Sequence, residues 1–503
     1  GMEVNNVDRS STYFNGVGMQ YGMGMLGSYD YKYFKQASEE NSMYYSLSNG
    51  YSREASFFAT ATYSWKGRYT FNVTGRYEGS NRLGKARSAR WLPTWNVSGA
   101  WNIHEEPWFD KLRPALSHAT FKTSYSLTGD KPAITNAESI FQSFNPWRPF
   151  SADKESGIEV YSLANPDLTY EKKHEFNLGL DLGFLDNRLN VELAYYLRNN
   201  YDLIGPKITT GEGGTIMKYA NVASMRSYGE EVTISSRNIV TKDFQWSTDF
   251  IFSHTKSKVT DLQSQNRLIN MIAGSGFTSK GYPYRALFSM DFQGLNNHGI
   301  PTFINQDGNL VTSDIDFQSY NLDHLIYEGP TDPTFSGSLG NTFSYKGLHL
   351  NVFITYAAGN KVRLDPAFST GYSDLTAMPK EFQNRWVVPG DENHTDIPAI
   401  ADYRQLQSDA YLGYAYTAYN YSHNRIAKGD FIRMKEISIA YDVPLSLIKH
   451  IGLSSMSLKL QGTNLFLIYS DKKLNGQDPE FMNSGGVAVP MARQFTFTVR
   501  LGI

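Results

Sequence analysis

MARQFTFTVRLGI, residues 491–503, decides the fold because hydrophobic and polar side chains alternate along it. Successive side chains of a β-strand point to opposite faces, so a strand with this sequence has one hydrophobic and one polar face. Segments of about ten residues with the same alternation recur from Phe57 onward, separated in turn by short and long connections. This arrangement is typical of an antiparallel transmembrane β-barrel. The hydrophobic positions here are Phe495, Phe497, Val499, Leu501 and Ile503.

Two predicted hairpins show the pattern most clearly. In the first, residues 57–65 and 69–77 alternate on both sides of a turn at Lys66 and Gly67. In the second, residues 176–184 and 189–197 alternate on both sides of Asp186 and Asn187. Short turns between period-two segments indicate antiparallel neighbours, and the whole chain reads as about fourteen to sixteen strands. Further hairpin turns are predicted around 238–243, at 346–347 and near 444–454.

The connections at the other strand ends are long. Bacterial barrels have short periplasmic turns and long extracellular loops, so these connections are predicted to be extracellular. If short turns and long loops alternate strictly, one further strand must lie between about Met290 and Pro330. The long connections are predicted at 129–170, 199–227, 256–284, 359–429 and 470–490.

Composition supports this fold class and excludes several functions. Aromatic residues make up 14% of the chain while the mean hydropathy is −0.43, a balance expected when lipid-facing and lumen-facing residues alternate. No run of about 18 apolar residues occurs, which excludes a membrane-spanning helix. The net charge of −2 argues against a nucleic-acid partner. Cysteine is absent, so disulfides and thiolate metal sites are excluded.

A soluble all-β glycan-binding or surface-adhesion protein is the alternative, because it would also bury one face of each strand. Aromatic placement favours the membrane barrel over this alternative. Tyr and Trp recur near strand ends, where they form girdles at both membrane interfaces of a barrel. Examples are Tyr63, Trp65, Tyr69, Tyr77, Trp95, Trp101, Tyr195, Tyr345, Tyr356 and Tyr441.

Several segments, in order along the chain, resemble the SusC/RagA-type TonB-dependent outer-membrane transporters. The first two are RYEGSNRLG from Arg76 and RWLPTWNVSGAWNIHEEPWF from Arg90. Two departures from the family pattern are Glu78 where Asp is usual and Tyr170 where Trp is usual. The resemblance extends over residues 54–503. The later segments are NPDLTYEKKHEF from Asn165, WVVPGDENHTDIP from Trp386, GDFIRMKEISIAYDVP from Gly429 and NLFLIYSDKKLNGQDPE from Asn464.

This resemblance implies the C-terminal portion of a 22-stranded barrel, with the plug domain outside this chain. We expect an N-terminal loop with a candidate first strand at 1–53 and barrel strands with long extracellular loops at 54–503. The resemblance also implies import of oligosaccharides or peptides across the bacterial outer membrane. The implied partners are a SusD-like surface lipoprotein, membrane lipid, and TonB acting through the plug.

Candidate ligand-binding residues lie in the predicted loops, where exposed aromatic faces could stack on sugar rings or peptide side chains. The same aromatic residues could instead pack the loops together, since large loops need small cores of their own. DKKLNGQDPE from Asp471 lacks oxygen ligands at the third and twelfth positions of a calcium loop, which are Lys473 and Met482, and is predicted to be a turn at Asn475 and Gly476. Catalytic residues, metals and cofactors are not predicted. The candidate ligand-binding residues are Trp147, Arg148, Tyr161, Tyr320 and Tyr403.

Overall fold

In a computed structural model of the chain, one large antiparallel sheet dominates the fold. The structure describes residues 1–14, 45–113, 115–131, 139–144, 157–208, 217–263, 266–274, 276–373, 375–484 and 490–503. In this part the sheet has fourteen strands, and each strand pairs with the next one of the sheet along the chain. They are β1 (Met2–Phe14), β2 (Tyr45–Trp65), β3 (Tyr69–Ser80), β4 (Trp91–Asn102), β5 (Leu116–Asp130), β8 (Glu171–Phe184), β9 (Leu189–Ile208), β10 (Met217–Val240), β11 (Phe244–Leu262), β17 (Phe335–Tyr345), β18 (Leu348–Ala358), β21 (Phe431–Asp442), β22 (Ser455–Ser470) and β23 (Gln494–Gly502).

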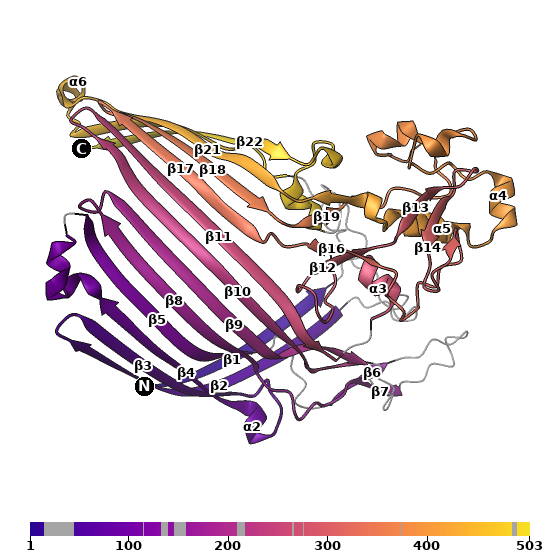
Figure 1. The fold of residues 1–503 in the computed structure, drawn as a ribbon. Helices are drawn as coiled ribbons and strands as arrows, with labels where there is room; N and C mark the ends of the chain where they lie inside the picture. The colour runs from indigo at the N-terminus through magenta and orange to yellow at the C-terminus, as the bar shows by residue number, and fades with distance from the viewer. Residues whose placement is uncertain are drawn as a thin grey trace, which may run out of the picture.

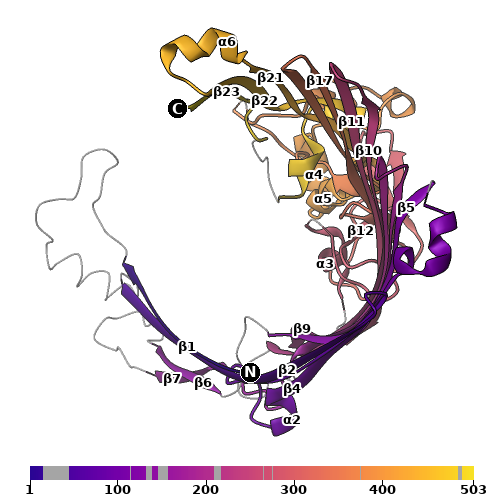
Figure 2. The same cartoon turned by 90° about the vertical axis from the view of Figure 1, so that its left-hand side faces the viewer.

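The sheet is strongly curved, as a barrel wall must be. Its strands run side by side at a tilt in Figure 1, and Figure 2 shows them as an arc seen along the direction of the barrel axis. β1 and β23 form the two edges of the sheet in the described residues. The curvature gives the sheet a convex and a concave face, and alternation along each strand assigns successive side chains to opposite faces.

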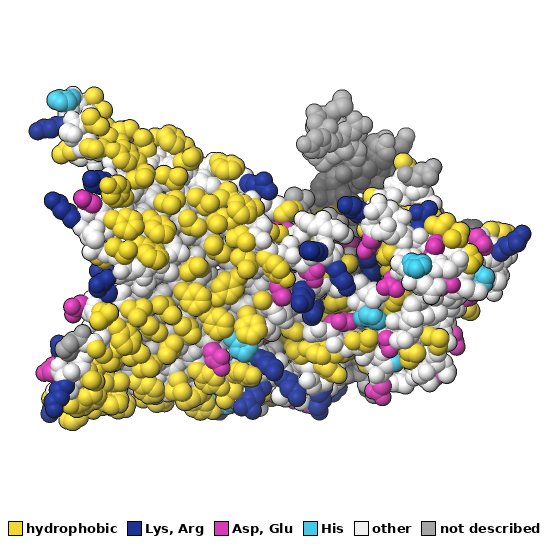
Figure 3. Space-filling view, turned by 45° about the horizontal axis from the view of Figure 1, so that its top comes forward, with side chains coloured by type: hydrophobic (Ala, Val, Ile, Leu, Met, Phe, Trp, Pro, Cys, Tyr) yellow, Lys and Arg dark blue, Asp and Glu magenta, His cyan; other side chains and the backbone are white. Residues whose placement is uncertain are grey.

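The convex face is hydrophobic across neighbouring strands. Val73 of β3 lies opposite Val97 of β4, which lies opposite Tyr125 of β5, and the row continues through Phe176 of β8 to Leu197 of β9. Figure 3 shows hydrophobic side chains gathered over these strands, with charged side chains toward both ends. Val73 and Val97 are 50% and 47% exposed, so protein does not cover this belt. The predicted antiparallel barrel wall with a lipid-facing side is confirmed.

The concave face carries polar side chains that bond to one another between strands. Thr60 and Thr74 hydroxyls lie 3.2 Å apart, and Asn177 Nδ2 donates to Ser124 Oγ at 3.2 Å. Lys122 and Asp181 form an ion pair on the same face. A face built from hydroxyls, amides and paired charges suits a water-filled lumen.

Short turns join the strands at one end of the sheet. Lys66 and Gly67, and likewise Lys346 and Gly347, have positive φ angles, as tight hairpin turns require. Longer turns at this end hold short helices, and all of them lie on the left in Figure 1. These helices are η1 (Ile103–Glu105), η2 (Pro107–Lys111), α6 (Leu445–Ile448) and η8 (Lys449–Ile451).

The long connections correct the predicted strand positions in two ways. First, β11 pairs directly with β17, so the strand expected between Met290 and Pro330 does not exist in the large sheet, and residues 263–334 form one connection. Second, β9 and β10 continue to Ile208 and from Met217, so most of the predicted loop 199–227 is strand. The strands extend past the hydrophobic belt, where the connection before β8 packs against them: Val222 is 3% exposed and Asn221 Nδ2 donates to the Thr169 carbonyl at 3.0 Å. Alternation of hydrophobic and polar residues is lost there.

The described residues of the connections 263–334 and 359–430 fold together into what we call the loop body, to the right of the strands in Figure 1. Its main core contains Leu268, Phe303 and Ile315 from the first connection and Phe368 and Tyr419 from the second. No helix in the described part of the chain is long and apolar enough to cross a membrane. The loop body contains α3 (Leu268–Ile272), β12 (Ala286–Ser289), β13 (Phe292–Leu295), β14 (Pro301–Ile304), β15 (Leu310–Val311), β16 (Ile326–Pro330), β19 (Lys361–Arg363), η5 (Lys380–Asn384), η6 (Asp391–Asn393), α4 (Tyr403–Ser408), α5 (Leu412–Asn420), η7 (His423–Arg425) and β20 (Ile426–Lys428).

The remaining elements also lie in connections at the loop end of the sheet. α2 (Arg87–Arg90) follows β3, and the β6–β7 hairpin (Ile140–Phe144 and Gly157–Ser162) lies between β5 and β8. η9 (Lys472–Leu474) and η10 (Pro479–Ser484) follow β22. The long connections therefore carry most of the structure outside the barrel wall.

Candidate ligand-binding sites in the loops and on the inner face

The predicted ligand-binding residues lie in different parts of the loops. Trp147 and Arg148 fall outside the described residues. Tyr161 is exposed on β7, and Tyr403 is exposed at the first position of α4. Tyr320 is exposed in the loop body, where Arg267 Nε donates to its hydroxyl at 3.2 Å. The described structure does not bring the rings of Tyr161, Tyr320 and Tyr403 into contact with one another.

Other loop aromatic residues divide between packing and exposure. Tyr419 is 1% exposed and meets Phe292 and Phe368 edge to face, with ring centroids 5.4 and 5.1 Å apart, so it packs the loop body. Burial of its hydroxyl raises the pKa of Tyr419 well above the usual value. Tyr411 and Tyr414 lie near the surface with ring centroids 5.6 Å apart. Tyr419 therefore packs the loop body, and Tyr403 is a surface residue.

Exposed hydrophobic side chains gather around α4 and α5. α4 begins at a capping box, in which Asp402 accepts from the Gln405 backbone N–H and Gln405 accepts from the Asp402 N–H, both at 2.8 Å. This cap fixes the start of the helix, so the Tyr403 ring projects from its first turn. We call the following residues the α4–α5 surface: Tyr403, Leu406, Tyr411 and Tyr414, which are all exposed.

A pocket lies between the loop body and the connection after β22, and we call it the loop pocket. Arg425 is 3% exposed, forms an ion pair with Glu381 and donates from Nη2 to the Asp365 carbonyl at 3.3 Å. Lys473, from the connection after β22, also lines this pocket, and its Nζ donates to the Ile426 carbonyl at 3.2 Å. Its lining includes Leu364, Asp365, Lys380, Glu381, Arg425, Lys473 and Gln477. The pocket therefore offers both cations and carboxylates to a ligand.

Asp471 holds the connection after β22 against the loop body. Its carboxylate accepts from the backbone N–H groups of Lys428 at 2.8 Å and Lys473 at 3.0 Å. Burial opposes ionisation, but these donors and the two lysine charges hold the pKa of Asp471 below its usual value. Asn475 and Gly476 follow with φ angles of 50° and 86°. The stretch predicted to be a turn is a turn, and Asp471 is part of it.

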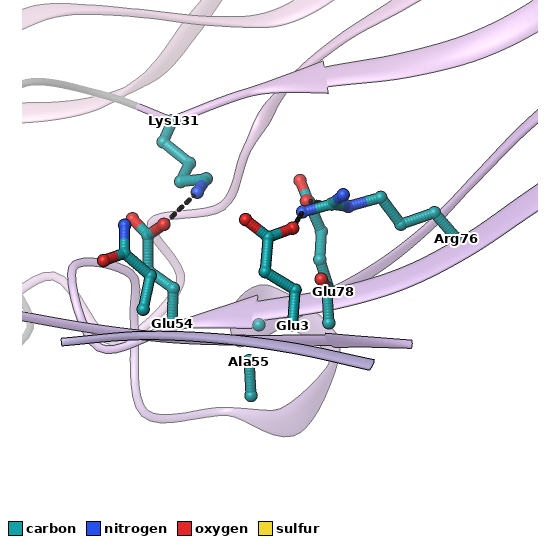
Figure 4. A pocket seen from close by; sticks show the side chains of 9 residues that line it. Glu3, Glu54, Ala55, Arg76, Glu78 and Lys131 are labelled. Atoms are coloured by element: carbon teal, nitrogen blue, oxygen red, sulfur yellow. Dashed lines mark hydrogen bonds and ion pairs between the residues drawn. The ribbon is translucent and has the colours of Figure 1, made fainter. Parts of the chain in front are cut away.

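A group of charged residues lies on the concave face where β1, β2 and β3 meet, and we call it the inner-face cluster. It consists of Glu3, Glu54, Arg76, Glu78 and Lys131. Arg76 donates to Glu78 at 2.8 Å and to Glu3 at 3.1 Å, and Lys131 lies 2.6 Å from Glu54. Figure 4 shows these side chains on one side of the strands.

Tyr170, which stands where the resembled family usually has Trp, lies beside this cluster. It is fully buried against Leu83 and Leu92, and its hydroxyl donates to the Glu78 carbonyl at 3.5 Å. Sequence reasoning missed the inner-face cluster and the loop pocket, because both join residues that are far apart in the chain. The sequence offered one signal for the inner-face cluster. Residues 54, 76 and 78 are charged and occupy the polar positions of strands whose other face is hydrophobic.

A curved antiparallel sheet with a hydrophobic convex face, a polar concave face and long loops at one end defines an outer-membrane β-barrel wall. The model of the family described as TonB dependent receptor-like, beta-barrel, matches residues 3–271. The chain belongs to this family of TonB-dependent receptors and is an outer-membrane protein. The soluble alternative is therefore wrong.

Similar proteins extend this assignment beyond residue 271. TonB-dependent receptor P3 of Formosa agariphila is 26% identical over 448 residues, covering 84% of this chain and 42% of that protein. TonB-dependent receptor SusC of Bacteroides thetaiotaomicron is 24% identical over 478 residues, covering 89% of this chain and 43% of that protein. The solved RagAB peptide transporter has the same fold, with a TM-score of 0.76 at 20% identity over 99% of this chain and 52% of that chain. The chain spans less than half the length of the two receptors P3 and SusC.

Proposed function

We propose that this chain forms barrel wall and extracellular loops of a TonB-dependent importer that takes up oligosaccharides or peptides. The observation that carries this proposal is a lipid-facing barrel wall whose polar concave face continues toward a folded loop body with its own pocket. In the proposal, residues 54–503 supply strands and loops, and TonB supplies energy through a plug region. A transport path along the concave face suits polar substrates, because hydroxyls, amides and paired charges line that face.

The substrate would first meet the aromatic and charged groups of the loops. Tyr161, Tyr320 and Tyr403 expose rings that can stack on sugar rings, and we keep Trp147 and Arg148 as candidates beside them. The charged groups of the loop pocket suit the termini of a short peptide, because carboxylates and ammonium groups form charge-assisted hydrogen bonds. The likeness to SusC and to the RagAB peptide transporter supports import of oligosaccharides or peptides.

We propose that a SusD-like lipoprotein docks on the α4–α5 surface and caps the extracellular face. Tyr403 is 74% exposed and Tyr411 is 63% exposed, and exposed apolar side chains that lie together in one patch mark protein interaction sites. Tyr and Trp side chains are enriched at protein interfaces because one ring supplies both apolar area and a hydrogen-bonding group. These exposed rings support a protein partner at this end of the loop body.

The proposed import is tested in cells that produce the full-length gene product. Uptake of fluorescent peptides and fluorescent oligosaccharides is measured with and without the TonB system. We expect saturable, TonB-dependent uptake of one of the two classes, and loss of that uptake when the gene is deleted. If neither class enters although the protein is in the outer membrane, the proposed function is wrong.

The proposed partner is tested by affinity purification after cross-linking. The variant carries Tyr403→Ala and Tyr411→Ala, and the matched control carries Leu375→Ala, which removes a 96% exposed side chain elsewhere in the same connection. We expect a surface lipoprotein to co-purify with wild type and control but to be lost from the double variant. Equal recovery from all three proteins would contradict docking on the α4–α5 surface.

A further inference from the structure

Strand pairing places Ser56 in one row with two members of the inner-face cluster, Glu3 and Glu78. Glu3 of β1 lies opposite Ser56 of β2, and Ser56 lies opposite Glu78 of β3. Glu54 is two residues before Ser56 and therefore points to the same face. Figure 4 shows Glu3, Glu54 and Glu78 on one side of the strands and Ala55 on the other. Ser56 consequently sits at the base of a ring of carboxylates.

The charges of this cluster do not balance. Arg76 forms ion pairs with both Glu78 and Glu3, with nitrogen–oxygen distances of 2.8 and 3.1 Å. Lys131 forms an ion pair with Glu54 at 2.6 Å. Two cations therefore face three carboxylates, which leaves an excess of one negative charge among the described residues. The side chains of Glu78 and Glu54 are 12% and 23% exposed and that of Glu3 is 54% exposed, so water screens the charge of Glu3 but screens Glu78 and Glu54 less.

Ser56 supplies a second, independent observation. It is 3% exposed, and its hydroxyl oxygen is buried with no hydrogen-bond partner among the described residues. Buried hydroxyls in proteins are nearly always hydrogen-bonded, so an unpartnered one calls for a missing partner. The cavity lined by Ser56 and the inner-face cluster has a volume of about 10 Å³, which is the space of a single water-sized group.

We propose that this cavity binds one ammonium group, which donates hydrogen bonds to the Ser56 hydroxyl and to the carboxylates of Glu3 and Glu78. An ammonium group has three donors and one positive charge, so it matches both the acceptors and the charge excess. A guanidinium group is larger than the cavity. The described residues contain no group of three side chains placed to hold a metal ion, which disfavours a divalent cation.

The ammonium group can come from two sources with the same chemistry. One is a lysine or amino terminus of another part of the full-length protein, and the other is an amino group of an imported substrate. Only the second source rests on the proposed import function. The site itself depends on the geometry of β1, β2 and β3.

The first experiment measures methylammonium binding to the purified full-length gene product in detergent, with tetramethylammonium as a probe that has no donors. Ser56→Ala removes the unpartnered acceptor, Glu78→Gln removes one charge, and Thr60→Ala is the control on the same strand and face. If no amine of the protein fills the cavity, we expect methylammonium but not tetramethylammonium to bind, with affinity about tenfold weaker in Ser56→Ala and Glu78→Gln and unchanged in Thr60→Ala. If an amine of the protein fills it, we expect neither probe to bind to the wild-type protein and a cross-link to form in the second experiment. Heat-modifiable migration checks that each variant folds.

The second experiment identifies the source of the amine. A zero-length carboxylate-to-amine cross-linker should join Glu3 or Glu78 to an amine of the protein if that source is internal. Otherwise, a peptide with a free amino terminus should bind better than its N-acetylated twin, and Ser56→Ala should abolish the difference. If methylammonium does not bind, no cross-link forms and the two peptides bind equally, the cavity holds only water and the proposal is overturned. Failed import with retained methylammonium binding would refute the proposed function and leave this site intact.

Discussion

Two adjacent residues of β10, Val232 and Thr233, point to opposite faces of the sheet, so arginine should have opposite consequences at these positions. Val232 lies opposite Leu193 of β9 and Phe252 of β11 on the hydrophobic convex face. Thr233 lies opposite Glu192 of β9 and the exposed Ile251 of β11 on the concave face. Val232→Arg therefore places a charge among lipid tails, whereas Thr233→Arg places the same charge in the lumen beside a carboxylate.

The expected magnitudes separate the two variants clearly. Arginine on the lipid-facing side of a barrel costs about 2–4 kcal/mol near the middle of the bilayer. That cost lowers the folding equilibrium constant roughly 30- to 700-fold, because each 1.4 kcal/mol is a factor of about ten. In the lumen, water and Glu192 solvate the guanidinium, so Thr233→Arg should change the free energy of unfolding by less than about 0.5 kcal/mol.

The assay is folding of the full-length gene product into lipid vesicles across a urea series, followed by heat-modifiable migration on gels. Wild type and Thr233→Arg should fold with similar urea midpoints, and the Val232→Arg midpoint should fall well below both. Matching midpoints for Val232→Arg and Thr233→Arg, or the reverse order, would refute the assignment of the convex face to lipid.

Three further predictions concern the loops. Tyr419→Ala should destabilise the loop body by about 3–5 kcal/mol, seen as faster limited proteolysis there while the barrel keeps its heat-modifiable migration. Arg433→Met should leave the carboxylate of Asp478 buried without its cation, since their side chains are 8% and 7% exposed, and hydrogen exchange should rise in η10. Burial lowers the pKa of His324 below 6.5, so the loop body should be most stable above about pH 6.5 and lose stability as the pH falls through that value toward the lower folded-state pKa. His324→Gln should flatten this pH dependence of proteolysis.

The membrane-spanning part of the fold could be predicted from the sequence. Alternation along residues such as Phe495, Phe497 and Val499 depends only on strand geometry and on one face meeting lipid. Tight turns were equally readable, because Gly67 and Gly347 supply the positive φ angles that short hairpins need. Strand ends were not readable, since β9 and β10 continue past the lipid, where Val222 is buried and Asn221 bonds to Thr169 of another connection.

The candidate sites depended on contacts that no local pattern records. Tyr403 and Tyr419 lie in the same connection, yet one is 74% exposed and the other 1% exposed. That difference arises because Tyr419 meets Phe292, from the other long connection of the loop body. Sequence reasoning therefore named Tyr403 as a candidate but could not separate it from a core residue.

By itself the sequence determined the alternating, lipid-facing part of most barrel strands, which side of those strands meets lipid, and that long loops lie at one end. These properties follow from the order of side chains along a strand and from the solvent on each face. Only the tertiary structure decided that two long connections share a core and that Glu3, Ser56 and Glu78 form one row. That row requires the register of three strands, with Glu3 and Glu78 lying 75 positions apart (78 minus 3), and register is fixed by the pairing of whole strands in space.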